Sequence, residues 1–138
     1  MKILILVILF TLLFHRIKYT PISLSKTFWI KFIEKNKQIN MNDKTEQIGC
    51  AIILMLFLQL FLVIFYIVLG NKIGTTEFII LSALQVMSCI WNFINDLEDA
   101  RTIYSTDISN LTYRRFNRLF NLLLDYIYYP WAIYMLLK

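Results

Sequence analysis

The 138-residue sequence predicts an all-α, polytopic integral membrane protein with three or four transmembrane helices and one interfacial amphipathic helix. Hydrophobic residues make up 59% of the chain, whereas roughly 45–50% is usual for a soluble domain. Two uncharged apolar runs, 48–69 and 78–94, are joined by a short polar turn. A single domain spanning residues 1–138 is too small to bury two such helices in a water-soluble core.

Residues 1–19 are predicted to form an N-terminal membrane anchor. The apolar core at 3–14 has 12 residues and covers about 18 Å as a helix, less than the roughly 30 Å of a bilayer core. Arg16 and Lys18 can extend their aliphatic stems to the membrane surface and so lengthen the span. A cleaved secretion signal is the alternative, but no small-residue cleavage site follows. Pro21 is expected to end this helix.

Residues 22–37 are predicted to form an amphipathic helix in the plane of the membrane interface. Its apolar face consists of large side chains at helical spacing: Phe28, Trp29, Phe32 and Ile33. Lysines lie mostly on the opposite face, and Ile30 interrupts the pattern. We expect Trp29 to lie at the depth of the lipid headgroups. The alternative is a helix that docks on a partner protein.

The two central runs are predicted to form a transmembrane hairpin. The first, 48–69, has 22 uncharged residues with Gln59 as its only strongly polar side chain, and it covers about 33 Å as a helix. The second, 78–94, begins a stripe of polar residues spaced three or four apart: Ser82, Gln85, Ser88 or Cys89, Asn92 and Asp96. This face should contact protein, with Gln59 as its partner, or line a polar path.

Residues 119–137 are predicted to form the last transmembrane helix. One face of this helix carries polar side chains: Asn121, Asp125, and Tyr128 or Tyr129. Asp125 lies about 9 Å inside the span, and an ionisable group at that depth is a candidate functional residue. It either conducts protons or ions, or it pairs helices, with Arg118 as the expected partner. Pro130 is expected to kink the helix.

The polar segment 95–118 is predicted to be a loop, and its arginines should form a basic collar around the entry to the last helix. Anionic phospholipid headgroups are the expected partners of this collar: Arg114, Arg115 and Arg118. The acidic residues at 95–99 should face the collar, and Mg²⁺ binding is the alternative. Eleven basic residues in two long segments oppose three elsewhere. This imbalance places both long loops on the cytoplasmic or matrix side of the membrane.

No catalytic or metal-binding pattern is visible in the sequence. The chain has one histidine and two cysteines, Cys50 and Cys89, which both lie in apolar runs. We therefore expect no enzymatic activity and no cofactor. The net charge of +5 is assigned to membrane-facing loops, and no nucleic-acid partner is expected.

These observations predict a non-catalytic structural or assembly subunit of a larger multi-subunit membrane complex. The polar stripes exceed what Gln59 alone can pair, so other membrane-protein subunits should supply partners, alongside anionic phospholipids. Residue types with AT-rich codons dominate the chain. This bias favours an organellar energy-transducing assembly, a respiratory or ATP synthase complex, in the mitochondrial inner membrane, or else a bacterial cytoplasmic membrane. A phage or bacterial effector, such as a holin or immunity protein, is the second hypothesis. A proton- or ion-conducting component that uses Asp125 is the third.

Overall fold

The computed structural model describes residues 2–39, 44–105 and 113–138, with side chains except those of 36–39, 44–51 and 99–105. This described part forms five helices and no strand, which confirms the all-α prediction. The helices are α1 (Lys2–Leu24), α2 (Lys26–Ile39), α3 (Lys44–Ile73), α4 (Thr76–Ser105) and α5 (Arg115–Leu137).

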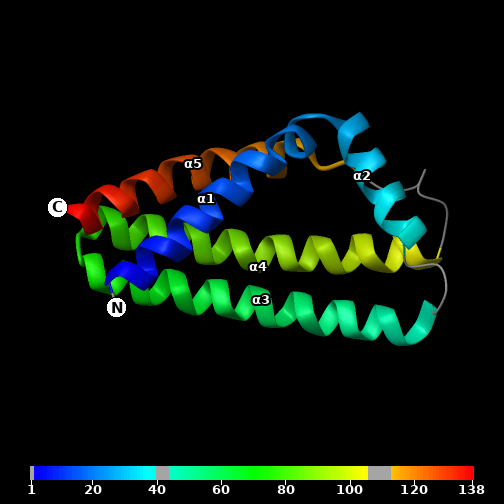
Figure 1. Cartoon of the computed structure of the whole chain (residues 1–138), viewed down its shortest axis with the longest axis horizontal. Coiled ribbons are helices and arrows are strands. Elements are labelled where there is room, and N and C mark those ends of the chain that lie inside the picture. The colour runs from blue at the N-terminus through cyan, green and yellow to red at the C-terminus, as the bar shows by residue number, and fades with distance from the viewer. Residues whose placement is uncertain (1, 40–43, 106–112) are drawn as a thin grey trace.

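The four long helices pack as two pairs (Figure 1). Helices α3 and α4 form an antiparallel hairpin, and α1 packs along α5. Both ends of the chain and the α3–α4 turn lie at one end of the molecule, which we call the terminal end. Helix α2 lies at the other, which we call the α2 end. Helices α1 and α4 both run from the terminal end toward the α2 end.

The α3–α4 turn is tighter than the predicted polar stretch. Helix α3 continues to Ile73, beyond the predicted end of the run at 69. Gly74 then adopts a left-handed conformation with φ of 71°, which only glycine enters without cost. Its N–H donates to the Gly70 carbonyl at 2.9 Å, and the Thr75 carbonyl accepts from Ile79 at 2.9 Å to begin α4. This glycine C-cap reverses the chain within two residues.

Helix α4 does not end where its apolar run ends at residue 94. It continues to Ser105, so the predicted loop at 95–118 is wrong over its first eleven residues. The sequence contains no glycine or proline between Gly74 and Pro130. Charged residues alone do not break a helix, and the hydropathy change at 94 marks a change of surroundings.

Pro21 does not end α1, which continues to Leu24. The proline removes only one hydrogen bond, and the loss falls in the last turns of the helix. Thr20 Oγ1 donates to the Arg16 carbonyl at 2.9 Å, and the Ser25 N–H donates to the Pro21 carbonyl at 3.1 Å. Ser25 alone separates α1 from α2.

Helix α2 buries a narrower face than the sequence pattern predicts. Trp29 and Ile33 are buried, and Ile30 packs against them together with Ile22 and Tyr113. Two other members of the predicted apolar face are exposed: Phe28 and Phe32. Ile30, which interrupts the sequence pattern, therefore belongs to the contact, because α2 packs against α1 and against the segment before α5.

Within the described residues, three helices are long and apolar enough to cross a membrane. They cover Lys2–Leu24, Ile52–Ile73 and Thr76–Glu98. The N-terminal segment, which was predicted as a short anchor, thus reaches full length as part of α1. Helix α5 is long enough at 23 residues, but it is not among the three.

The contact between Gly70 on α3 and Ser82 on α4 leaves no room for a larger residue. A Cβ atom at Gly70 would lie 2.9 Å from both Cβ and Oγ of Ser82. We expect Gly70→Ala to destabilise the folded chain by about 1–3 kcal/mol through overpacking. In an open helical site the same change stabilises by about 1 kcal/mol. Thermal unfolding in detergent measures whether Gly70→Ala is less or more stable than the wild type. A more stable variant would contradict the close contact. Adding Ser82→Gly should remove the penalty of Gly70→Ala, relative to Ser82→Gly alone.

Candidate functional site

The interior of the bundle is apolar toward the terminal end and polar toward the α2 end. The apolar half is built around five nearly or fully buried side chains: Leu9, Tyr66, Leu69, Phe78 and Tyr128. Further along the same helices, the inward positions carry Arg16 on α1, Gln85 on α4 and Asn121 on α5. The polarity of the interior changes along the bundle because each helix carries apolar inward residues near the terminal end and polar ones near the α2 end.

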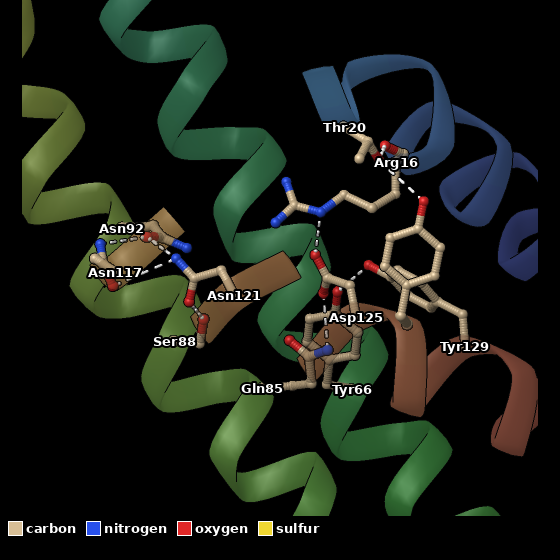
Figure 2. Close-up of polar contacts among 11 residues, drawn as sticks. Arg16, Thr20, Tyr66, Gln85, Ser88, Asn92, Asn117, Asn121, Asp125 and Tyr129 are labelled. Atoms are coloured by element: carbon tan, nitrogen blue, oxygen red, sulfur yellow. Dashed lines mark hydrogen bonds and ion pairs between the residues drawn. The ribbon is translucent and has the colours of Figure 1, made fainter. Parts of the chain in front are cut away.

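A ladder of side-chain hydrogen bonds joins α4 to α5 (Figure 2). Its rungs, in order from the terminal end, are Ser82–Tyr128 at 3.1 Å, Gln85–Asp125 at 2.9 Å, Ser88–Asn121 at 2.5 Å, and Asn92–Asn121 at 2.6 Å. Asn117 also donates to Asn92, at 3.1 Å. We call these contacts the polar ladder. They bring together four site residues expected from the sequence: Gln85, Asn92, Asn121 and Asp125.

The sequence suggested Gln59 as the partner of the polar stripe on α4, but Gln59 does not pair with this stripe. The stripe on α5 has the same spacing and runs antiparallel, so the two stripes satisfy each other. Gln59 instead lines the cavity described below, and its Oε1 atom is buried without a hydrogen-bond partner in the described part of the chain.

Asp125 connects three helices (Figure 2). Its Oδ2 atom lies 2.8 Å from Arg16 Nε on α1, and its Oδ1 accepts from Gln85 Nε2 on α4 at 2.9 Å. The exposed fractions of the two charged side chains are 23% for Arg16 and 15% for Asp125. The predicted Arg118 partner is wrong, because α1 packs along α5 and brings Arg16 to the carboxylate.

The arginine collar is mostly engaged with the protein itself. Arg114 donates to Asn95 Oδ1 and pairs with Glu98 Oε2 at 2.5 Å. The Arg118 guanidinium lies over the Trp29 ring, 4.7 Å from its centroid. Trp29 is only 4% exposed, and its contact with lipid headgroups stays a prediction. Arg115 is the collar residue whose side chain is exposed.

An aromatic layer separates the polar half of the interior from the apolar half. The hydroxyls of Tyr66 and Tyr129 share a hydrogen bond of 2.7 Å. The Tyr128 ring is fully buried and packs edge-on against Tyr66, with centroids 5.1 Å apart. It also packs against the Phe78 ring in a tilted arrangement, with centroids 4.9 Å apart. Tyrosine suits this boundary because its ring is apolar and its hydroxyl needs a polar partner.

A polar cavity of about 260 Å³ lies between the helix pairs. Its lining includes side chains from four helices and from the residue that precedes α5: Arg16, Gln59, Asn95, Arg114, Arg118 and Asp125. The ladder residues and the Tyr66–Tyr129 pair form part of its wall. A polar space of this size can hold several water molecules, each of which needs two to four polar partners.

The side chains described offer no group of three or more His, Cys, Asp or Glu that could hold a metal ion. Of the acidic residues considered for Mg²⁺, Glu98 pairs with Arg114, and the Asp99 side chain falls outside the described residues. The Cys50 side chain is likewise not among the described side chains.

Comparison with protein-family models, curated proteins and solved structures gives no match. The class of protein is therefore defined by the fold and the site alone. It is a helical bundle in which, among the described residues, three helices are long and apolar enough to cross a membrane, with a polar cavity in its interior.

Sequence reasoning missed the role of Arg16. Its assigned function was to reach the membrane surface, whereas it lies inside the bundle on Asp125. The tyrosine pair was also missed. The available signal was the number of ionisable residues in apolar segments: Asp125 required a cation, and Arg16 is the arginine that borders the N-terminal apolar run.

Asn121 is the most connected residue of the polar ladder, since it contacts Ser88, Asn92 and Asn117. We expect Asn121→Leu to reduce stability in detergent by about 2 kcal/mol, because interhelical hydrogen bonds contribute about 0.6 kcal/mol each and the partners lose theirs too. Asn71→Leu at an exposed position is the control and should change stability little. Equal unfolding temperatures for the two variants would contradict the ladder.

Proposed function

We propose that the protein is an integral membrane protein with a non-catalytic, structural role, working as a subunit of a larger membrane complex. The supporting observation is that polar groups lie inside and apolar groups outside, the reverse of a water-soluble protein. Hydrogen-bonded polar groups lie inside the bundle, whereas only 11–22% of the residues in each apolar span are buried. Lipid is the surrounding that such a surface matches.

The exposed apolar surface is too large for a soluble monomer. On α3 alone, exposed large side chains run along most of the helix: Ile53, Leu54, Leu56, Phe57, Leu58, Leu60, Phe61, Ile64, Ile67 and Val68. Each buried side chain of this kind contributes about 1.5–3 kcal/mol when removed from water. Soluble monomers rarely expose apolar patches above a few hundred Å². A bilayer or an apolar partner removes this cost.

The polar contacts support a structural role for the inner residues. Asp125 is engaged by Arg16 and Gln85, and the α4 and α5 stripes pair within the chain. Partner subunits are therefore no longer needed to satisfy these groups, and they would meet the bundle through its apolar faces. The packing leaves a place for them: α3 packs extensively only on α4, and α1 packs mainly on α5 and α2. The exposed apolar faces of α1 and α3 are the surfaces that a neighbour would cover. Composition points to an organellar or bacterial energy-transducing membrane.

Purification of the native protein in mild detergent tests this proposal. The expected result is resistance to alkaline extraction from membranes and migration as a particle well above the 16.5 kDa chain in its micelle, with defined comigrating proteins. A monodisperse single chain in detergent would argue against the subunit role. Release from membranes into detergent-free buffer would refute the membrane location.

Proton or ion conduction is the second candidate, and one observation favours it. Asp125 lines the cavity together with Arg16, so water can reach a carboxylate inside the bundle. In this arrangement the aromatic layer and the apolar half close the path toward the terminal end. Conduction would therefore require these side chains to move.

Reconstitution into phospholipid vesicles with a pH gradient separates the two candidates. For a conducting protein, Asp125→Asn should abolish the protein-dependent proton flux while the amount of folded protein is unchanged. For a structural residue, the wild-type chain should give no flux above empty vesicles, and the variant should unfold more readily. Glu77→Gln, at an exposed position near the start of α4, is the matched carboxylate control.

A further inference from the structure

Arg16 uses only one edge of its guanidinium group. Its Nε atom faces Asp125 Oδ2 at 2.8 Å. The two terminal nitrogens point away from the carboxylate (Figure 2). Among the described residues, no hydrogen bond or ion pair to these terminal nitrogens is found. The pair of parallel N–H donors on that edge matches two oxygens of one anion.

Other lining atoms of the same cavity also lack partners. Asn95 Nδ2 and Gln59 Oε1 are buried without a hydrogen bond in the described part of the chain. Buried polar atoms without partners are uncommon and point to a missing water, ion or ligand. The cavity therefore presents an amide donor and an acceptor in addition to the arginine edge.

The charge of the lining favours an anion. Three arginines face two aspartates there: Arg16, Arg114 and Arg118 against Asp96 and Asp125. Two lining carboxylates would repel an incoming anion, Asp96 and Asp125, and Asp125 is paired with the Nε edge of Arg16. A cation with a free donor edge, in a bundle with an apolar exterior, is stabilised most by a bidentate anionic partner.

We propose that this cavity binds a phosphate group, held by the terminal nitrogens of Arg16 with Asn95 as a neutral donor. The group can come from the headgroup of an anionic phospholipid or from free phosphate, because the recognition chemistry is the same. The cavity occupies the half of the interior toward the α2 end, next to the arginine collar. The lipid source rests on the membrane location proposed above, whereas the free-phosphate source does not.

The test uses the full chain in phosphatidylcholine nanodiscs. Radiolabelled inorganic phosphate is titrated directly in one arm. In the other arm the discs contain phosphatidic acid, and native mass spectrometry after transfer to detergent counts the retained lipid. Retained phosphatidic acid identifies the headgroup source, and saturable binding in discs without anionic lipid identifies the free ion.

The variants separate the site from the fold. Arg16→Gln together with Asp125→Asn removes both charges and keeps a neutral hydrogen-bonding pair, so the helices stay connected. Arg16→Lys keeps the charge but loses the donor edge. Arg115→Gln is the control, because Arg115 is exposed and lies outside the cavity lining. Unfolding temperatures of all variants are measured in the same discs.

The expected result is saturable binding by the wild-type chain that falls at least about tenfold, or about 1.4 kcal/mol, in the double variant. Arg16→Lys should fall in between, and Arg115→Gln should bind as the wild type does. Equal binding by the wild type and the folded double variant, or no binding in either arm, would overturn the proposal. Particle size and comigrating proteins report on the proposed subunit role separately, so the two can fail independently.

Discussion

A carboxylate among apolar helices must find its partners within the protein, and this constraint organises the interior. Asp125 meets it with a guanidinium from α1 and an amide from α4. Both contacts are directional, so they fix the rotation of three helices about their axes. Breaking a fully buried ion pair costs about 3–5 kcal/mol, and an exposed pair contributes only about 0–1. With 15–23% exposure, this pair lies between those limits.

The division of the interior into two halves determines what the bundle can do. On one side of the aromatic layer, side chains such as Leu69 and Phe78 pack without polar contacts. On the other side, amides and arginines surround the cavity. The Tyr66–Tyr129 and Ser82–Tyr128 hydrogen bonds lie at the boundary between the two halves. The charged residues thus lie in the half of the interior toward the α2 end, with the aromatic layer between them and the apolar half.

Much of the fold was predictable because it depends on composition and period. Apolar runs gave the helices, and spacing of three or four residues placed the stripe residues such as Gln85 and Asp125 on shared faces. The partners of those residues were not predictable. Periodicity gives the direction of a side chain relative to its own helix but not the identity of the facing helix. Gln59 and Arg118 were therefore paired incorrectly, since the packing of α1 on α5 depends on the whole chain.

Helix ends were less predictable than helix faces, because hydropathy and helix propensity are separate properties. Helix α4 crosses from apolar to charged sequence without a break. Pro21 is accommodated where only one hydrogen bond is lost. Trp29 illustrates a similar limit: an aromatic residue beside lysines resembles an interfacial anchor, but the ring is covered by Arg118.

The antiparallel register of the polar ladder has an evolutionary consequence. On the apolar exterior a side chain only has to be apolar, so Leu, Ile and Phe can replace one another there by neutral mutation. Inside, each rung requires a donor opposite an acceptor at a fixed offset. A compensating exchange across α4 and α5 preserves the rung, whereas the deletion of one residue in either helix turns the following rungs by about 100° and unpairs them together.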